Sequence, residues 1–595
     1  MSWGGFLPMR KLKNNEFIQT SYQVKSIALL QMSQWLSRNG VRHVVLCPGS
    51  RSAPLTLAIA RSGLMKIFTG VDERSAGFAG LGLALGTQRP VVVVCTSGTA
   101  LLNLGPAVAE AFYLRLPLVI LSADRPAGYE GQQRGQVIRQ DGVLDHHLRA
   151  FFRWAPDEPA WDVSSSEKLF DQAFATAMNE CGPIHINVPL CEPLYENQEI
   201  VQTQIHSPSM GNKMTLKQRQ IKSSIVSNLQ GDLMNALETG KKIWFLAGMN
   251  RPDEGLRNIL QDLQNLGVGC IWHEDLANIK AGIPIRDEWF RTSPLDVPSL
   301  LISWGGPLVS KHLQLFLRHN PHFKHWRIDP RGDCIDTYNR LDGVWKSSPE
   351  LALKSIHNII QKFVQKNPLT TRFPSDKPKS ALNALALKSV VDFDQKMRIR
   401  YPNLPFSDAL ALSVVLPYLK YCRVHLGNSS LVRKFLALPW DKSEIKSIHC
   451  NRGTSGIEGS VSTAIGEAWA HPEDSLWILN GDLATAYDAG AWMLEPRPSV
   501  KMVILNNGGG DIFRELPGSS IQPECEQLFA TPRSIQWSSW CQGYGRPHRL
   551  ATDLDSLREG LNWLSALEGT GFLEILTHPS PNRQAEKILR EGIES

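Results

Sequence analysis

Two short polar segments in the last third of the chain carry residue types that could bind a metal ion. Gly481-Asp482 directly follows the apolar run SLWILN, and Asn507-Gly508-Gly509 directly follows KMVILN. Open α/β sheets bind ligands at the carboxyl ends of their strands, so both segments are expected at such an edge. A carboxylate and an amide oxygen are hard donors suited to Mg²⁺, and glycines let a diphosphate approach the backbone. By themselves, however, two such segments are more often ordinary turns.

An acid, Glu73, begins a predicted helix over 73–88, immediately after the strand-like run MKIFTG. The helix dipole favours an acid in the first turn, so this position has a purely structural explanation. The glycines from Gly80 to Gly86 resemble a dinucleotide motif, but the third glycine comes one residue late and the run lies inside the helix. Asp145-His146-His147 predicts no metal site, because adjacent histidines point in different directions.

The bulk composition indicates a folded protein of several domains. At 595 residues the chain exceeds the ~250–300 residues at which a single core stops growing. Hydrophobic residues at 42% and charged residues at 20% are ordinary for globular proteins. The net charge of +6 arises from 63 basic and 57 acidic side chains without a long basic run, so no nucleic-acid partner is expected.

Cysteine usage and hydropathy favour a cytoplasmic protein. The ten cysteines are scattered and form no CxxC pair, which argues against a zinc site and against a disulfide framework. The amino terminus has no apolar segment with a cleavage site, and no apolar stretch reaches 18 residues. We therefore expect no integral membrane segment.

Strand-like apolar runs alternate with helical patterns along three stretches of the chain, which is typical of parallel sheets covered on both faces. The fold class is therefore α/β, with three domains at 20–205, 206–382 and 383–595 and mainly parallel sheets. Helices are also expected near 430–438 and 459–470. The expected strands are HVVLC, PVVVVCT, PLVILSA and PIHINV; IWFLAG, GCIW, LLISWGG and HWRIDP; and RVHLGN, SLWILNGD, KMVILNNG and GFLEILTH.

Several motifs together resemble the thiamine-diphosphate-dependent enzymes, and most closely the 2-succinyl-5-enolpyruvyl-6-hydroxy-3-cyclohexene-1-carboxylate synthase family of menaquinone biosynthesis. The resemblance covers nearly the whole chain after residue 20, and the order of the motifs is more specific than any one of them. The motifs are CPGSRSAPLTLA (47–58), DERSAGF (72–78), TSGTALLNL (96–104), SADRP (122–126), GQVIRQ (135–140), GNSSLVR (427–433) and NRGTSGIEG (451–459).

The resemblance implies the thiamine-diphosphate-binding fold, with a pyrimidine-binding, a central and a diphosphate-binding domain. Asp482, Asn507 and the Gly509 carbonyl would hold Mg²⁺, with Mn²⁺ as an alternative. Glu73 would hydrogen-bond N1′ of the aminopyrimidine and activate the cofactor. Gln136 would lie near the reacting carbons, and Ile457 beneath the cofactor; Ile457 could also be plain core.

The resemblance also implies the substrates, 2-oxoglutarate and isochorismate, whose carboxylates suit arginine. The reaction would decarboxylate 2-oxoglutarate and join the remaining carbons to isochorismate. A homodimer or homotetramer follows, because the family places the cofactor between two subunits. The 2-oxoglutarate group would be Ser429, Arg433 and Arg452; the isochorismate group would be Ser50, Arg51, Arg125 and Lys311, although Arg125 could simply end a strand.

Two positions depart from the family pattern. A Lys-Arg pair of the family is Lys311-His312 here, so the second cation depends on pH; His312 is either a partner for an isochorismate carboxylate or a solvent-facing helix residue. Gly508 stands where the family has a third asparagine, between the presumed ligands.

Two other functions stay open at this point. A thiamine-diphosphate decarboxylase or acetolactate-type synthase would use a small apolar 2-oxo acid, and Arg433 and Arg452 argue against it. A cofactor-binding regulatory protein would keep the fold without the chemistry, and Glu73 argues against that.

Overall fold

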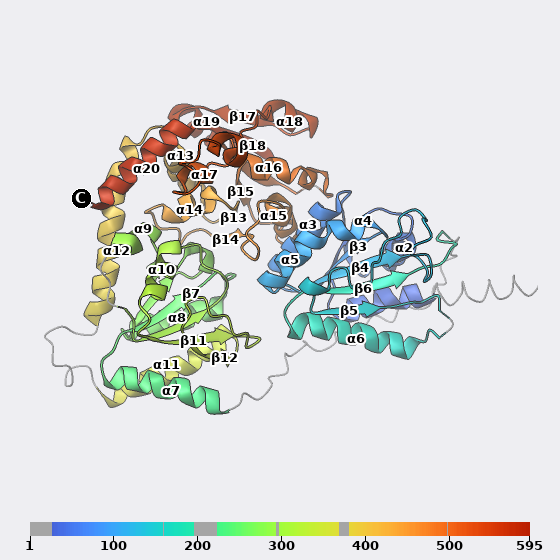
Figure 1. Cartoon of the computed structure of the whole chain (residues 1–595), viewed down its shortest axis with the longest axis horizontal. Coiled ribbons are helices and arrows are strands. Elements are labelled where there is room, and N and C mark those ends of the chain that lie inside the picture. The colour runs from blue at the N-terminus through green and yellow to red at the C-terminus, as the bar shows by residue number, and fades with distance from the viewer. Residues whose placement is uncertain are drawn as a thin grey trace, which may run out of the picture. The chain divides into compact units, whose positions relative to one another are not determined.

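Buried apolar runs form the centres of three six-stranded sheets (Figure 1). The computed structural model describes residues 27–158, 160–195, 223–292, 297–367, 380–496 and 498–594. In these ranges every pairing between two named strands is parallel. Central strands such as β3 (Val91–Cys95) and β10 (Leu300–Trp304) are buried throughout, as expected for strands covered by helices on both faces. The predicted α/β class with parallel sheets is confirmed.

The first sheet has the strand order β2-β1-β3-β4-β6-β5. Its helices include the predicted helix over 73–88, which runs from Glu73 to Thr87. The strands are β1 (His43–Leu46), β2 (Lys66–Thr69), β3, β4 (Leu118–Asp124), β5 (Ala150–Arg153) and β6 (Ile184–Pro189), and the helices are α2 (Ala53–Ser62), α3 (Glu73–Thr87), α4 (Thr99–Asn103), α5 (Gly105–Leu114), η1 (Asp145–His147) and α6 (Val163–Asn179).

The central sheet has the order β12-β11-β10-β7-β8-β9. The strands are β7 (Ile243–Ala247), β8 (Cys270–His273), β9 (Ile283–Pro284), β10, β11 (Lys324–Asp329) and β12 (Leu341–Lys346), and the helices are α7 (Ser223–Glu238), α8 (Glu254–Asn265), η2 (Asp275–Ala277), α9 (Asp287–Thr292), α10 (Lys311–His319) and α11 (Pro349–Lys366).

The third sheet, β14-β13-β15-β16-β18-β17, repeats the strand order of the first sheet. The strands are β13 (Arg423–Leu426), β14 (Ser447–Cys450), β15 (Leu476–Gly481), β16 (Val500–Asn506), β17 (His548–Ala551) and β18 (Gly571–Leu576). The helices are α12 (Ser380–Arg400), η3 (Tyr401–Asn403), α13 (Asp408–Val415), η4 (Leu416–Leu419), α14 (Ser430–Ala437), α15 (Ser460–Ala470), α16 (Asp482–Tyr487), η5 (Ala489–Met493), α17 (Ile512–Glu515), η6 (Cys525–Ala530), α18 (Trp537–Gly543), α19 (Leu554–Ala566) and α20 (Pro579–Glu594).

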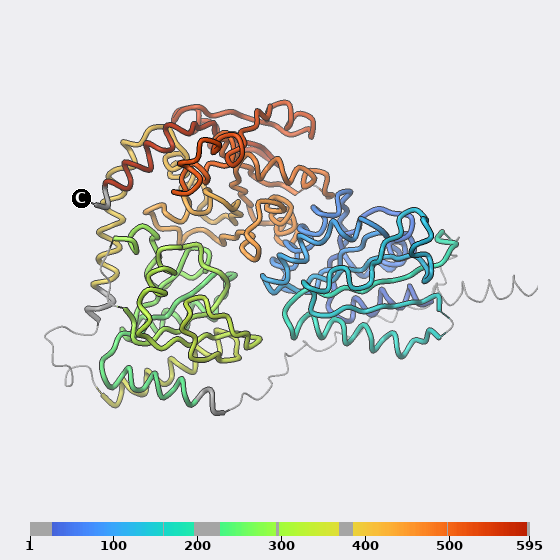
Figure 2. Tube along the Cα trace, viewed as in Figure 1, coloured from blue at the N-terminus to red at the C-terminus, as the bar shows by residue number. Residues whose placement is uncertain are grey.

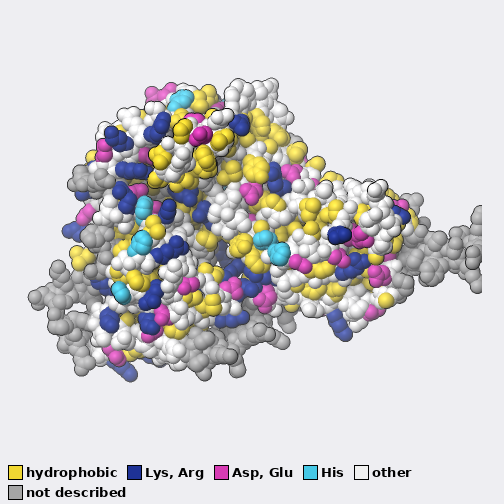
Figure 3. Space-filling model, viewed as in Figure 1, with side chains coloured by type: hydrophobic (Ala, Val, Ile, Leu, Met, Phe, Trp, Pro, Cys, Tyr) yellow, Lys and Arg dark blue, Asp and Glu magenta, His cyan; other side chains and the backbone are white. Residues whose placement is uncertain are grey.

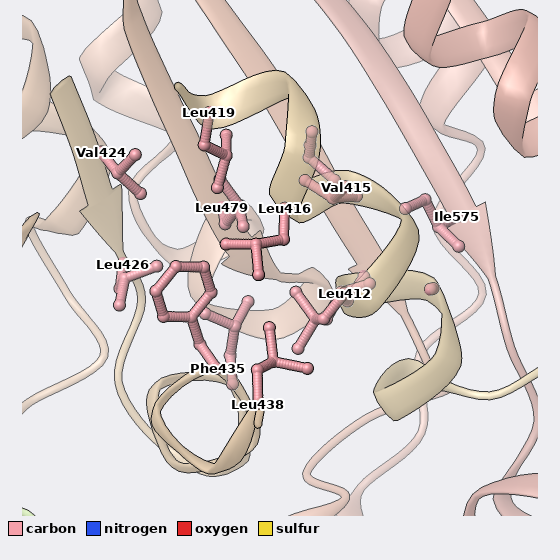
Figure 4. Packing of buried hydrophobic residues seen from close by; sticks show 14 of the residues in the cluster. Leu412, Val415, Leu416, Leu419, Val424, Leu426, Phe435, Leu438, Leu479 and Ile575 are labelled. Carbon is pink, nitrogen blue, oxygen red and sulfur yellow. The ribbon is translucent and has the colours of Figure 1, made fainter. Parts of the chain in front are cut away.

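The core beneath the third sheet is built from leucine-rich helices. In Figure 4, Leu412 and Leu416 from α13 and η4 point toward Phe435 of α14 and Leu479 of β15, and these side chains are buried. Burying such a side chain contributes about 1.5–3 kcal/mol, so this packing holds α13 and α14 against the third sheet. On the outside, α12 runs beside α20, which is also clear in the trace of Figure 2.

The chain divides into two compact units. One contains the first sheet together with residues 462–471 and 490–497, and the other contains the central and third sheets. Each of the predicted ranges 20–205, 206–382 and 383–595 contains one sheet, while their boundaries stay a prediction.

Within the first unit, the added residues pack closely on the sheet and on α3. The Phe68 and Trp469 rings stack with centroids 4.3 Å apart, and Trp469 Nε1 donates to the Pro496 carbonyl at 2.7 Å. A Cβ on Gly82 would lie 1.9 Å from the Thr463 carbonyl oxygen, so Gly82 permits a close approach of two helices. Gly82 of α3 therefore serves helix packing.

The surface mixes charges of both signs. On the face shown in Figure 3, Lys and Arg side chains alternate with Asp and Glu side chains. In the described part of the chain, no helix is both long enough and apolar enough to cross a membrane.

Candidate active site

The carboxyl edge of the third sheet carries five of the predicted site residues. Ser429 and Arg433 follow β13, Arg452 follows β14, Asp482 follows β15, and Asn507 follows β16. The chain leaves β13 for the edge strand β14 and then returns to β15 on its other side, so the switch in strand order lies at β13. Parallel sheets bind ligands at such switch points.

Asp482 is a buried acid at this edge, with 2% of its surface exposed. Its carboxylate accepts hydrogen bonds from the backbone N–H groups of Leu483 at 2.8 Å and Gly509 at 2.9 Å. Burial nevertheless raises the pKa of Asp482 to about 6, because desolvation disfavours the charged form. A bound cation would offset this penalty.

Asn507, on the adjacent strand, is also buried and presents an oxygen without a partner. Its Nδ2 donates to Asp408 Oδ2 at 2.9 Å, whereas Oδ1 has no hydrogen-bond partner among the described residues. A buried polar atom left unpaired costs about 1–3 kcal/mol. A cation bound to this oxygen would remove that cost. The donor chemistry of Asp482 and Asn507 therefore fits a divalent cation.

The turn after Asn507 is shaped by glycine and held by an arginine. Gly509 has φ +116°, and a Cβ there would lie 2.3 Å from the Ala530 carbonyl oxygen. Arg514 donates to the carbonyls of Asn507 at 3.3 Å and Gly508 at 2.9 Å. The Gly509 carbonyl accepts from Asp511 N at 2.9 Å and retains a second lone pair for a cation.

The described residues contain no group of three His, Cys, Asp or Glu side chains arranged for a metal. A cation at this edge would therefore rely on one carboxylate, an amide and backbone oxygen, a set that suits Mg²⁺ completed by phosphate. The Asp145-His146-His147 segment forms the 3-10 helix η1.

Two arginines approach each other beside this turn. Arg433 donates to the Ser429 carbonyl. The backbone of Ser429 has φ 72°, which is uncommon for a residue other than glycine. Arg452 is 9% exposed; its Nη1 donates to Asn428 Oδ1 at 3.0 Å, and its Nε has no partner among the described residues. Although Arg433 reaches solvent, partial burial and then the positive charge of Arg452 lower its pKa. The pair is suited to an anion.

Lys311 and His312 are the first two residues of α10, a helix that follows strand β10 of the central sheet. Lys311 is exposed. The His312 ring donates through Nδ1–H to Asp287 Oδ2 at 3.0 Å, and His312 N donates to Asp287 Oδ1 at 2.8 Å. Asp287 also raises the pKa of Arg433, so the start of α10 lies in the electrostatic range of the arginine pair. Only Nε2 of His312 remains to meet a substrate.

Glu274 supports the segment that leads into α10. It is 2% exposed and accepts from the backbone N–H of Val309 at 2.9 Å, and burial raises its pKa to about 7. Asp287 and Glu274 were not predicted from the sequence. They lie 25 and 35 residues before the groups that they accept from, and no local motif marks them.

Glu73 occupies the first position of α3, at the carboxyl end of β2 in the first unit. The preceding Asp72 caps the helix and accepts from Arg74 N at 3.0 Å, so the capping role belongs to Asp72. Two buried thiols, Cys47 and Cys95, lie near enough that Glu73 contributes to raising their pKa, after burial itself. The Glu73 carboxylate is therefore not needed to cap its own helix.

Arg51 and Arg125, at the carboxyl ends of β1 and β4, share one carboxylate. Arg51 is 3% exposed and donates from Nη2 to Glu192 Oε1 at 3.0 Å, and Arg125 Nη1 lies 4.0 Å from the same oxygen. Burial and then the charge of Arg51 lower the pKa of Arg125. Ser50 is exposed beside Arg51. Glu192 was not predicted, although an acid before a proline directly after a buried strand could have been noticed.

Gln136 and Ile457 lie in two loops that are anchored by polar side chains. Gln136 has φ 55° and packs its backbone against Gly98, whose N–H donates to Gln140 Oε1 at 2.8 Å. Ile457 is half-buried, and the neighbouring Gly456 carbonyl accepts from Asn428 Nδ2 at 2.6 Å.

The predicted residues are divided between the two compact units. Arg51 and Arg125 converge within the first unit, and Asp482 with the Asn507 turn and the arginine pair converge within the second. Glu73 belongs to one compact unit and Asp482 to the other, so their assignment to one site stays a prediction.

Comparison with known proteins identifies close relatives along almost the full chain. Residues 30–144 match the family described as thiamine pyrophosphate enzyme, N-terminal TPP binding domain. The 2-succinyl-5-enolpyruvyl-6-hydroxy-3-cyclohexene-1-carboxylate synthase of Desulfotalea psychrophila is 35% identical, over 91% of this chain and 96% of its own. The synthases of the same name from Cytophaga hutchinsonii and Flavobacterium johnsoniae are 31% and 32% identical, each over 95% of this chain and over 99% and 98% of their own.

Proposed function

Because the chain belongs to the family of 2-succinyl-5-enolpyruvyl-6-hydroxy-3-cyclohexene-1-carboxylate synthases, we propose that it decarboxylates 2-oxoglutarate and adds the remaining succinyl carbons to isochorismate. The product is the compound for which the family is named, and CO₂ is released. The reaction forms a carbon–carbon bond in menaquinone biosynthesis.

One observation carries the proposal from the family to this chain. At one sheet edge, a buried acid and an amide oxygen that has no partner among the described residues lie beside two mutually repelling arginines. A cation with a diphosphate satisfies the first pair, and a dicarboxylate satisfies the second. A synthase that used pyruvate would have no use for guanidinium groups facing a methyl group.

Thiamine diphosphate supplies, when bound, a nucleophilic carbon equivalent to an acyl carbanion. Asp482, Asn507 and the Gly509 carbonyl would hold Mg²⁺, or Mn²⁺, against the diphosphate. Glu73 would exchange a proton with N1′ of the aminopyrimidine, and Ile457 would support the cofactor from below. Gln136 would lie beside the reacting carbons.

The charged side chains would orient the two substrates. Arg433 and Arg452, with Ser429, would bind the carboxylates of 2-oxoglutarate. The isochorismate group would be Ser50, Arg51, Arg125, Lys311 and His312. The ring of His312 is already held by Asp287, which supports a fixed orientation of its Nε2.

We also propose a homodimer or homotetramer in the cytoplasm. The pairing of Glu73 with a diphosphate site from a second copy is the family's arrangement, and Glu73 and Asp482 do belong to different compact units here. The ten cysteines are scattered along the sequence without a CxxC pair, which supports a reducing compartment.

The direct test supplies the purified chain with thiamine diphosphate, Mg²⁺ and both substrates. We expect isochorismate absorbance to fall only when 2-oxoglutarate is present, with one CO₂ released for each ring consumed. Release of CO₂ from pyruvate with unchanged isochorismate absorbance would instead identify a decarboxylase. Cofactor binding without any turnover would identify a regulatory protein.

A further inference from the structure

We propose that Asp408, a buried acid of α13, is the positioning residue that turns the Asn507 oxygen toward the cation. The inference rests on the proposed function, because it concerns the same metal site. Asp408 is 1% exposed and lies 99 residues before Asn507 in the chain. It is too deeply buried to touch substrate.

Both carboxylate oxygens of Asp408 accept hydrogen bonds. Oδ2 accepts from Asn507 Nδ2 at 2.9 Å and from Lys434 Nζ at 3.0 Å. Oδ1 accepts from Thr577 Oγ1 at 2.6 Å, and the backbone N–H of Asp408 donates to Asn582 Oδ1 at 2.9 Å. The side chain is thereby held by three donors, and the backbone by a fourth hydrogen bond.

This arrangement determines which end of the Asn507 amide faces the ligand site. A carboxylate that is paired with a lysine has no proton to donate, so it can only meet the NH₂ end of the amide. The oxygen must then point the other way, where it is buried and has no partner among the described residues. A cation is the ligand that such an oxygen suits.

Lys434 ties this contact to the rest of the site. Its Nζ lies 3.0 Å from Asp408, 2.8 Å from Asp511 and 2.8 Å from Glu515. The neighbouring residue along α14 is Arg433, and Arg514 holds the Asn507 carbonyl from the other side. The amide is therefore fixed through its side chain and its backbone at once.

A purely structural role for Asp408 makes a different prediction. An acid in the first turn of α13 is favoured by the helix dipole. If that were its only role, replacing it would lower thermal stability and leave the cation affinity of the folded protein unchanged. Cation affinity therefore separates the two roles.

The test measures Mg²⁺-dependent binding of thiamine diphosphate to the full chain by calorimetry. Asp408→Asn leaves Lys434 with two carboxylates and should weaken Mg²⁺ binding about 10- to 100-fold, the usual range for such supporting residues. Thr577→Val is the matched control, since it removes the other hydrogen bond to Asp408 and leaves the Asn507 contact. It should bind Mg²⁺ within about threefold of the wild type, well below the effect of a supporting residue.

A double variant that exchanges the side chains of Asp408 and Asn507 provides the second measurement. Asp408→Asn combined with Asn507→Asp preserves total charge and restores one amide and one carboxylate across the same contact. It should recover at least about tenfold of the Mg²⁺ affinity lost in Asp408→Asn. Wild-type affinity in Asp408→Asn, or no recovery in the exchange, would overturn the inference while leaving the proposed function intact. A wild-type chain that binds no cofactor with Mg²⁺ would overturn both.

Discussion

Several predicted site residues have buried polar atoms without a hydrogen-bond partner in the described part of the chain. These atoms are Nε of Arg51, Arg125 and Arg452, and Oδ1 of Asn507. A buried polar atom without a partner is costly, and a bound cation or anion would remove that cost at these four positions. The motifs led to these residues, whereas Asp287 and Asp408 could not be predicted, because each reaches the site from an element without a recognisable local pattern; Glu192 was marked only by its place before a proline after a buried strand.

Glu73→Gln should retain thiamine diphosphate but lose about 10²–10⁴-fold in activity, the usual contribution of a positioned acid–base group. Exchange of the cofactor C2 proton on the protein is the measurement. Asp72 caps α3 through its own side chain, so folding should be unchanged. An exchange rate equal to the wild type would remove Glu73 from the mechanism.

Arg452→Ala should weaken the use of 2-oxoglutarate by about 2–5 kcal/mol in kcat/KM, because a buried carboxylate would lose its partner. Arg433→Ala should act in the same direction. Arg558→Ala, on an exposed face of α19, serves as the control. Equal losses for pyruvate and 2-oxoglutarate would show that neither arginine contacts the distal carboxylate.

Glu192→Gln should lower the KM for isochorismate, because the Glu192 carboxylate now occupies the arginine pair that the substrate needs. The gain should be up to about fivefold, since an exposed ion pair contributes ~0.2–1 kcal/mol. Inhibition by sulfate should increase in parallel. Glu158→Gln, which pairs with Arg153, should change neither value, and a raised KM in Glu192→Gln would show that Glu192 supports the arginines instead of competing.

At the scale of elements, burial decided what the sequence could reveal. The interior strands β3, β4, β7, β10, β15 and β16 are continuous apolar runs and were predicted. The strands that the pattern missed are β5, β9, β12, β14 and β17. Every one of them lies at an edge of its sheet. Edge strands bury one side only and are short or polar, so they lack a distinctive run. The helices α3, α14 and α15 were predicted within one residue of their observed ends.

Gly82→Ala should destabilise the first unit by about 1–3 kcal/mol, because its Cβ would overlap the Thr463 carbonyl. Gly231→Ala is the matched control, since a Cβ at this helical position meets nothing within 4 Å. It should stabilise α7 by about 0.5–1 kcal/mol. Opposite shifts in the calorimetric melting temperature are expected, and a neutral Gly82→Ala would contradict the close packing of α3.

For the whole molecule, stability should fall at alkaline pH because of Glu586 in α20. Burial and the neighbouring Glu515 raise its pKa from 4.5 to about 9, so the folded chain holds a proton that the unfolded chain releases. This contribution to stability is complete below about pH 4.5 and is lost as pH rises through about 9. Between these pH values, the melting temperature of Glu586→Gln should rise relative to that of the wild type. Above about pH 9 the difference between the two melting temperatures should stay constant. Parallel curves from pH 6 upward would show that Glu586 is ionised in the folded chain.

The first unit also has a consequence for how the chain folds during synthesis. Its sheet is complete by Pro189, yet Trp469 and the 490–497 segment belong to the same unit and leave the ribosome only after the whole central sheet. Until then, Phe68 and the glycine face of α3 lack their covering side chains, so the early nascent chain exposes apolar surface of the kind that chaperones bind. Stalled chains ending before residue 460 should therefore remain protease-sensitive in the first 190 residues, and chains extending past residue 500 should become protected there.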